Sequence, residues 1–299
     1  MPYPLGHVNA YLIEGETPIL VDPGMDLGAL DAALLALGVG LEDVTDVLIT
    51  HHHPDHYALA GRLEVMDKRI WLPEMEIETG HRFWLELDRW IAAGRQELLL
   101  HGAPKALADE MEKSLRLTRA RVHPPRAPRG FSGRFTLGGR DFLALPAPGH
   151  AEGQAALLLD GEILLVADAL LERISPMVAR WPYSEKNPLK SFIETLDRLA
   201  EVPAEAVLPG HFEGFDLKTR AHEVKTHHAE RLAATRAALK EGPKTAWEVS
   251  LALFPDLSDP TQRRFALAET LAHLAYLEAK GEVCKNRHFH NAHAHYALC

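Results

Sequence analysis

Short hydrophobic runs separated by polar loops dominate the first two thirds of the chain. Val8 to Ile13 and Ile19 to Val21 have the length and residue types of strands around a glycine-containing turn. Val47 to Thr50 is a β-branched apolar run that leads directly into the sequence HHHPDH. Three later runs end beside polar residues in the same way: Phe142 to Leu145 before PAPGH, Ile163 to Val166 before AD, and Ala206 to Leu208 before PGH. The pattern predicts buried strands that deliver polar side chains at their ends.

Helical spacing appears in three other places. Leu27 to Leu37 predicts a helix that stops at Gly38. Residues 74–130 carry apolar side chains at helical spacing and predict a helical insertion over the site, with these members: Phe83, Trp84, Leu87, Trp90 and Ile91. The C-terminal region predicts three helices followed by a hairpin to Leu298: Ala221 to Lys240, Thr245 to Phe254, and Thr261 to Ala279. We therefore expect a catalytic domain at 1–220 and a small winged-helix-like domain at 221–299.

The composition is that of an ordinary globular protein of 299 residues, with 46% hydrophobic and 25% charged residues. No stretch approaches the roughly 20 apolar residues that a membrane span needs. The start, MPYPLGHVNAYLI, lacks the features of a secretory signal. Only Cys284 and Cys299 are present, so at most one disulfide could form. These observations favour a soluble, cytoplasmic protein with no membrane partner.

The net charge and the histidine content indicate which ligands the protein binds. A net charge of −10 argues against broad attraction to nucleic acid, although a local basic groove would still be compatible with it. Residues 221–299 contain ten Lys and Arg against nine Asp and Glu, so this region lacks the charge of an obvious nucleic-acid binder. The chain has 18 histidines, and neutral imidazole is the commonest protein metal ligand.

The segment His51 to His56 has the pattern His-x-His-x-Asp-His, which places four potential metal ligands within six positions. His51 and His53 project to the same side of an extended segment and suit one ion. The turn at Pro54 lets Asp55 and His56 face a second ion. Two ions need further ligands, and three residues at strand ends can supply them: His150, Asp168 and His211.

Each of these histidines and carboxylates also has a simpler interpretation. His150 and His211 could be turn residues after Pro-Gly, and Asp168 could cap a helix at Ala169. His52 points away from its neighbours and favours a packing role. Core or solvated positions are favoured over the pocket for three other histidines: His7, His81 and His101. Four histidines at the end of the chain are interpreted as one polar face of the hairpin rather than as a metal cluster: His288, His290, His293 and His295.

The order VDPG, THHHPDH, PGH, VAD and PGH across residues 19–211 resembles the metallo-β-lactamase fold superfamily. The resemblance implies an α/β fold, a four-layer αβ/βα sandwich with two metals at one edge of its sheets. It implies that Asp22 lies behind the ligands and that the metals are bound as follows: His51, His53 and His150 to the first, Asp55, His56 and His211 to the second, with Asp168 bridging both.

Departures from known branches refine the resemblance. The flavodiiron branch has a Glu where His53 stands, and true β-lactamases lack the bridging carboxylate at Asp168. Glyoxalase II enzymes resemble the sequence at the metal motifs but end in a different helical tail with basic glutathione contacts. Gln154 stands where many members of the superfamily have a further histidine. Residues 221–299 resemble the winged-helix tail of a β-lactamase-like subgroup that includes endoribonucleases. We interpret that tail as structural or dimer-forming, which would permit a homodimer.

The predicted chemistry is hydrolysis. Two divalent ions would lower the pKa of a shared water from 15.7 toward roughly neutral, giving a metal-bridging hydroxide. Asp55 is expected to orient this water or receive its proton. Asp168 is expected to bridge the two ions. Zinc suits such a mixed N/O site best, with iron or manganese possible. The favoured substrate is a small ester, thioester or lactone, with Arg82, Arg89 or Arg95 available for an anionic group. The alternatives are a metal-dependent endoribonuclease or phosphodiesterase, and a non-catalytic metal-binding protein.

Overall fold

The computed structural model describes residues 6–286 and 293–299. The chain forms two compact units, each assembled from three segments. The first unit contains Met1–Leu85, Thr118–Pro176 and Thr195–Ala221. The second contains Glu86–Leu117, Met177–Glu194 and His222–Cys299. The segment that the sequence marked as one helical insertion, 74–130, is thus shared between the two units.

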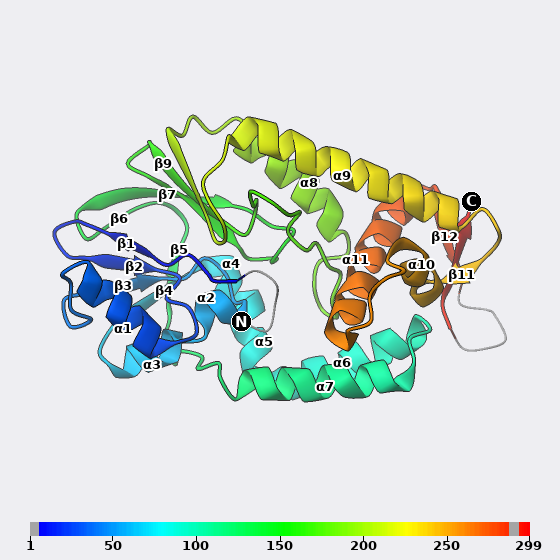
Figure 1. Ribbon diagram of the computed structural model, residues 1–299, viewed down its shortest axis with the longest axis horizontal. Coiled ribbons are helices and arrows are strands. Elements are labelled where there is room, and N and C mark those ends of the chain that lie inside the picture. Colours follow the sequence, from blue (N-terminus) through cyan, green and yellow to red (C-terminus); the bar gives the residue numbers. More distant parts are fainter. Residues whose placement is uncertain (1–5, 287–292) are drawn as a thin grey trace. The chain divides into compact units, whose positions relative to one another are not determined.

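Two five-stranded sheets form the framework of the first unit (Figure 1). The first sheet has the order β1-β2-β3-β4-β5, with β1 antiparallel to β2 and the other neighbours parallel. Its strands are β1 Tyr11–Ile13, β2 Ile19–Val21, β3 Asp46–Leu48, β4 Arg69–Pro73 and β5 Arg129–Phe131. The second sheet has the order β10-β9-β8-β7-β6, in which only β10 and β9 are parallel. Its strands are β6 Gly133–Leu137, β7 Arg140–Pro146, β8 Ala155–Leu159, β9 Ile163–Ala167 and β10 Ala206–Pro209.

The helices of the first unit are mostly short and follow the parallel strands. They are α1 Leu27–Ala36, α2 Pro54–Tyr57, α3 Ala60–Val65, α4 Glu74–Glu76, the π-helix η1 Ile77–His81, and α5 Arg82–Leu85. Helix α1 begins at Asp26, whose carboxylate accepts hydrogen bonds from the amides of Gly28 and Ala29. This N-cap satisfies amides that have no partner within the helix.

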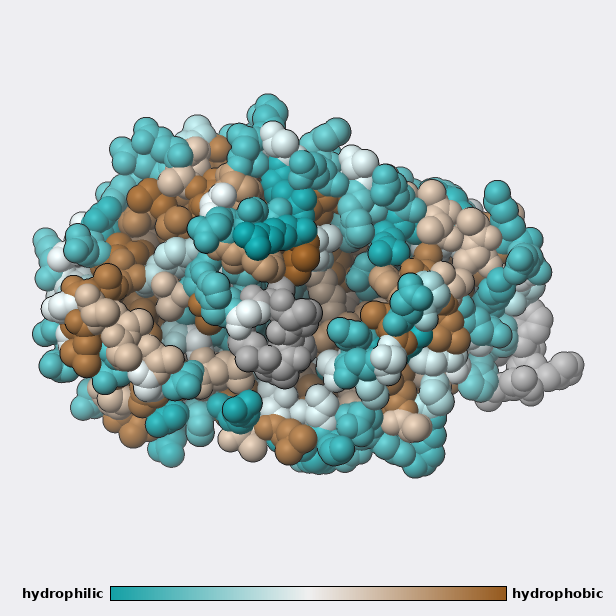
Figure 2. Space-filling model, viewed as in Figure 1, coloured by the Kyte–Doolittle hydropathy of each residue, from teal (hydrophilic) through white to brown (hydrophobic). Residues whose placement is uncertain are grey.

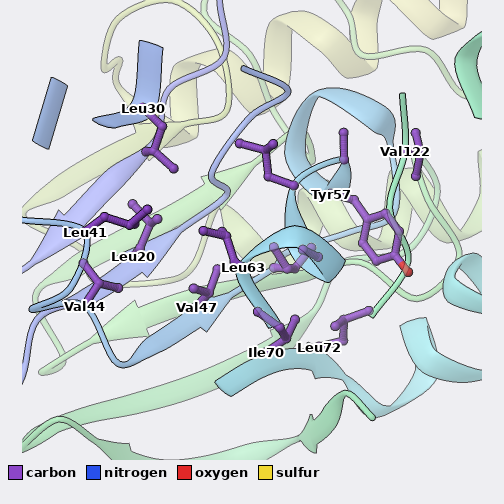
Figure 3. Close-up of a cluster of buried hydrophobic side chains, with 14 of the residues drawn as sticks. Leu20, Leu30, Leu41, Val44, Val47, Tyr57, Leu63, Ile70, Leu72 and Val122 are labelled. Carbon is purple, nitrogen blue, oxygen red and sulfur yellow. The ribbon is translucent and has the colours of Figure 1, made fainter. Parts of the chain in front are cut away.

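Side chains that alternate along the first sheet build two hydrophobic cores. Leu20 and Val47 face a core that includes Leu63 of α3 (Figure 3). Their neighbours Val21 and Leu48 face the opposite core, which lies between the two sheets. Alternation of this kind follows from the two-residue period of a strand. The first sheet is therefore buried on both faces.

The fourth layer lies against the second sheet. Helix α8 spans Pro188–Leu199, and its C-terminal end belongs to the first unit. There Thr195 Oγ1 donates to the carbonyl of Pro148 at 2.9 Å, and Arg198 Nη2 donates to that of Pro146 at 3.1 Å. Helix, sheet, sheet and helix make the four-layer αβ/βα sandwich that the family resemblance implied.

The second unit is mainly helical and ends in a small antiparallel sheet of order β11-β13-β12. Its elements are α6 Leu87–Leu100, most of α7 Lys105–Arg119, most of α9 Leu217–Ala238, β11 Lys244–Thr245, α10 Ala246–Leu253, α11 Pro260–Ala279, β12 Val283–Asn286 and β13 His295–Leu298. Thr245 and Glu248 form a reciprocal capping box at the start of α10. A disulfide joins Cys284 to Cys299 across the terminal hairpin.

Exposed hydrophobic side chains are scattered over the surface. On the face shown in Figure 2, hydrophobic residues lie over the region of α1, where Leu35 and Leu37 are exposed. Among the residues that the structure describes, no helix combines the length and the apolar character required to cross a membrane.

Candidate metal centre

The topology of each sheet gathers polar residues at one edge. Strands β2 and β3 are parallel, so Asp22 and His51, which follow them, emerge at the same edge of the first sheet. In the second sheet β7, β9 and β10 all point in one direction, because β8 is antiparallel to β7 and to β9. Their carboxyl ends lead to His150, Asp168 and His211. Candidate ligands from distant parts of the sequence therefore meet at strand ends, where the sheets fix the backbone that carries them.

One group of imidazoles consists of His51, His53 and His150, whose potential ligand atoms lie within 4.8 Å of one another. His51 Nε2 and His53 Nδ1 are 3.1 Å apart. The ring of His150 lies 4.5 Å from that of His53 and 5.2 Å from that of His51, measured between centroids. Three nitrogens that converge in this way can bind a single cation.

A second group consists of Asp55, His56 and His211, again within 4.8 Å of one another. Asp168 connects the two groups. Its Oδ1 lies 3.5 Å from His56 Nε2, and its Oδ2 lies 3.5 Å from His211 Nε2 and 3.6 Å from His150 Nε2. The structure thus brings together all seven residues that the sequence marked as ligands.

Asp22 lies behind these groups and is occupied by other donors. Its Oδ1 accepts the Thr50 amide at 2.8 Å, and its Oδ2 accepts the Thr50 hydroxyl at 2.6 Å and faces His56 Nδ1 at 2.8 Å. Asp22, His51 and His56 also fulfil the distance criterion for a cation site. However, a carboxylate that holds Nδ1 of an imidazole leaves Nε2 to face a metal, the usual arrangement behind a ligating histidine.

His211 is oriented by the N-terminal segment. Its Nδ1 donates to the carbonyl of His7 at 2.6 Å, which directs Nε2 toward Asp55 and Asp168. The side chains of Asn9 and Tyr11 hold the loop of His211, because both donate to the carbonyl of Pro209, at 3.1 and 2.6 Å. The sequence pattern gave no sign of these contacts between residues about 200 positions apart.

The backbone at the site adopts unusual conformations. Asp22, Ala167 and Phe212 have φ angles of 49°, 48° and 67°, in the left-handed region that costs non-glycine residues energy. Each is a site residue or the neighbour of one. A Cβ added at Gly210 would lie 2.0 Å from Asp168 Oδ1, so only glycine permits this close approach. Strained backbone conformations thus occur at the residues that orient the polar side chains of the site.

Burial and neighbouring charges shift the pKa values of the site histidines in opposite directions. Burial, reinforced by neighbouring imidazoles, holds the pKa of His51 and of His53 well below its usual value. These rings are therefore neutral, the form that binds metals. Burial also opposes protonation of His56, but the carboxylates of Asp168 and Asp22 outweigh it and hold the pKa of His56 well above its usual value.

The carboxylates are buried but remain ionised. Burial raises the pKa of Asp55 and of Asp168, yet His56 and His211 reverse this effect, so that both pKa values lie below the usual range. His56 Nε2, His211 Nε2 and Asp168 Oδ1 are buried without a hydrogen-bond partner among the residues that the structure describes. Buried polar atoms normally have partners. Unsatisfied nitrogens beside ionised carboxylates fit divalent cations.

The other candidate residues have different surroundings. His81 Nδ1 lies 2.6 Å from the buried hydroxyl of Tyr57, a core contact. His101 is buried in the second unit and stacks on Tyr296. His7 is exposed, and its described role is the carbonyl contact with His211. Of the hairpin histidines, His288 and His290 lie outside the described residues, whereas His293 and His295 are described and belong to none of the groups able to hold a metal.

The residues that the sequence placed at the substrate differ in what they contact. Trp84 is buried, and the ring of Trp90 lies 5.2 Å from that of Tyr183. Two of these residues contact the ligand loop, residues 51–56: the ring of Phe83 lies 5.7 Å from that of His52 between centroids, and Trp84 Nε1 donates to the carbonyl of His52. Two of the proposed arginines are held by acidic groups, Arg89 by Glu86 and Arg95 by Asp109 and Glu112. Gln154 is buried, and no described residue accepts from or donates to its side-chain amide.

Comparisons with known proteins agree with this architecture. A family model described as the metallo-β-lactamase superfamily matches residues 3–211, and one described as a metallo-β-lactamase-like C-terminal domain matches 232–293. The chain is 29% identical to the probable metallo-hydrolase YqjP of Bacillus subtilis (strain 168), over 93% of this chain and 90% of that protein.

Two solved structures extend the comparison. The metallo-β-lactamase family protein TTHA1429 of Thermus thermophilus is similar at 43% identity and a TM-score of 0.89, covering 100% of this chain and 96% of that one. The protein TTHA1623, solved in a di-iron-bound form, is similar at 27% identity and a TM-score of 0.50, covering 75% and 94%. The matches thus extend over both the sandwich and the C-terminal residues.

Proposed function

Because the chain belongs to the metallo-β-lactamase superfamily and is a metal-dependent hydrolase, we propose that it uses two divalent ions to hydrolyse a small ester, thioester or lactone. The position of Asp168 carries this proposal, since its two oxygens face imidazoles of both groups within 3.6 Å. We assign one ion to His51, His53 and His150, and the other to Asp55, His56 and His211. Asp168 would hold both ions, because its oxygens face imidazoles of both groups.

When bound, two such ions supply Lewis-acid assistance and lower the pKa of a water toward neutrality. The chain supplies the rest. Asp55 stays ionised because its pKa is lowered, so we assign its carboxylate the task of accepting a hydrogen bond from the attacking water and aligning it. Asp22 and the carbonyl of His7 fix the rings of His56 and His211 from behind.

We propose zinc as the metal, because imidazole and carboxylate ligands suit it. Iron is the main alternative, and the di-iron-bound form of the similar protein TTHA1623 supports it. Elemental analysis of protein purified without added metal, followed by activity measurements after loading with each ion, separates the two.

A small acyl substrate is supported by charge and by the surroundings of the loop. The chain carries a net charge of −10, which disfavours a polyanionic substrate such as RNA. The ring of Phe83 lies close to His52, so one half-buried aromatic side chain borders the ligand loop. Residues 221–299 carry almost no net charge, and we propose a packing role for this winged-helix-like region.

The test is a hydrolysis panel of aryl esters, acyl thioesters and lactones beside a single-stranded RNA. We expect turnover of at least one acyl substrate, its loss with a chelator, and its recovery with Zn²⁺. Asp168→Ala should be inactive under every condition. Cleavage of the RNA alone would instead establish a ribonuclease. Two tightly bound ions without turnover of any substrate would establish a binding protein.

A further inference from the structure

His52, between the ligands His51 and His53, is held at three points by one short segment. Its amide donates to Glu76 Oε1 at 2.6 Å, and its ring Nδ1 lies 2.5 Å from the same oxygen. Its carbonyl accepts from Trp84 Nε1 at 2.8 Å. Side chains of the segment 74–85 thus satisfy both backbone polar groups of the residue at the centre of the ligand loop.

These contacts matter because the loop has little regular hydrogen bonding of its own. Among the described residues, no backbone-to-backbone bond involves the amide or the carbonyl of His52. Buried backbone groups need partners, and here side chains provide them. Glu76 is fully buried, and hydrogen bonds to a carboxylate are stronger than those between neutral groups. Glu76 and Trp84 therefore fix the conformation from which His51 and His53 project.

The segment is shaped to reach this position. Strand β4 is parallel to β3, so the helices that follow β4 begin at the edge where the ligand loop follows β3. The π-helix Ile77–His81 places Gly80 against the loop. A Cβ at Gly80 would lie 2.1 Å from His52 Nδ1 and 2.2 Å from Glu76 Oε1. A π-helical turn is rare, and such turns occur frequently at functional sites.

Glu76 also supports the loop of the third imidazole. A Cβ at Gly153 would lie 2.5 Å from Glu76 Oε2 and 2.5 Å from the Cα of Glu76. Gly153 follows His150 by three residues, so the loop from His150 packs directly on Glu76. One buried carboxylate thus lies between the loops that carry His51, His53 and His150.

We propose that Glu76 and Trp84 are positioning residues for the cation held by His51, His53 and His150, and that they have little influence on the second cation. The inference rests on the two-ion site of the proposed function. Neither residue binds the metal. They act through the backbone of His52, and Glu76 acts also through the loop at Gly153. Loss of partners behind metal ligands typically weakens metal binding about 10- to 100-fold.

Calorimetric titration of the metal-free, full-length protein with Zn²⁺ tests this inference. We expect two ions per wild-type chain, and in Glu76→Ala one of them bound about 10- to 100-fold more weakly. Glu78→Ala is the matched control, because Glu78 is exposed on the π-helix that begins directly after Glu76. It should bind both ions as the wild type does.

Two backgrounds identify which ion is affected. His211→Ala retains the first group, His51, His53 and His150. In this background Glu76→Ala should lower the affinity for the one remaining Zn²⁺ ion. His150→Ala retains the second group, and there Glu76→Ala should change its affinity by less than about twofold, because outer partners act on the ligands that they contact. Equal weakening in both backgrounds would indicate general loosening of the fold and would overturn the proposal.

Conservative variants keep the proposal testable if Glu76→Ala fails to fold. Glu76→Gln retains an acceptor for the His52 amide and should recover most of the lost affinity. Trp84→Phe retains an aromatic ring but removes the donor to the His52 carbonyl. It should lower the Zn²⁺ affinity of the first group less than Glu76→Ala does. Wild-type affinity in folded Glu76→Ala, or in both conservative variants if it does not fold, would overturn the proposal.

The wild type separates this inference from the proposed function. A wild-type chain that binds two ions but hydrolyses none of the acyl substrates contradicts the proposed function, while the titration still decides the role of Glu76. A wild-type chain that binds no Zn²⁺ contradicts both.

Discussion

Each compact unit contains buried histidines, and the two sets have very different surroundings. In the first unit, the imidazoles of the metal centre stand beside three carboxylates, those of Asp22, Asp55 and Asp168. In the second unit, His228 of α9 and His273 of α11 contact each other at 3.3 Å. His273 Nδ1 donates to the carbonyl of Glu269 at 2.9 Å.

Charge separates the two sets more than burial does. Burial lowers the pKa of His228 and of His273, and the neighbouring imidazoles and the guanidinium of Arg231 lower that of His228 further. At the metal centre, carboxylates raise the pKa of His56 and of His211 in spite of burial. Histidines that meet without carboxylates behave as neutral core residues, whereas histidines that converge with carboxylates attract a cation.

The largest effect should come from removing the carboxylate that faces both imidazole groups. Asp168→Ala deletes the oxygens beside His56, His150 and His211, so we expect hydrolysis to fall by at least about 10³-fold, because water activation by the metals is lost. Steady-state rates and metal content per chain measure this. The matched change in the other set, His228→Leu, should leave turnover unchanged. Substantial activity in Asp168→Ala would contradict the contrast drawn between the two sets.

A smaller effect should follow from changing the carboxylate behind the site. Asp22→Asn keeps an acceptor for Thr50 but removes the charge that supports His56. We expect Zn²⁺ affinity to fall about 10- to 100-fold, as is typical of such outer partners. Asp26→Asn is the control, because Asp26 caps α1 and Asn is an equally good cap. Equal affinities in the two variants would show that charge at Asp22 does not matter.

The candidate metal ligands could be identified from the sequence because each lies in a local pattern, and the structure brings these residues together. Four of them lie within six residues, and His150, Asp168 and His211 each follow a recognisable apolar strand. The roles of Glu76, Asn9 and Tyr11 could not be predicted. Each depends on a contact between distant segments, and hydrophobic periodicity carries no record of which segments meet.

Hydrophobic periodicity also gave an incomplete description of the predicted insertion, residues 74–130. The spacing of Phe83, Trp84, Leu87 and Trp90 predicted helical structure, which is present as α5 and α6. Periodicity did not reveal the break at Glu86 or the π-helix before α5. It also did not reveal that residues 86–117 belong to the second unit, because that depends on packing between elements far apart in sequence.

The smallest effect concerns the pH dependence of stability in the second unit. Burial lowers the pKa of His228 to about 3 and that of His273 to about 4, from a usual value of 6.5. Below pH 6.5 the unfolded chain therefore binds protons that the folded unit excludes, and stability falls as the pH decreases toward 4. Glu269 acts in the opposite direction, because burial raises the pKa of its carboxyl to about 7.

His228→Leu isolates one histidine from these opposing contributions. Each buried neutral histidine contributes at most about 1.4 kcal/mol per pH unit to the slope of stability against pH. The variant should therefore lose less stability than the wild type between pH 6.5 and 4, as measured by urea unfolding of metal-free protein. His222→Leu changes an exposed histidine of the same helix and should retain the wild-type slope. The two variants could instead show the same slope of stability against pH. In that case burial does not keep His228 neutral, and the proposed difference between the two sets of histidines is wrong for the second unit.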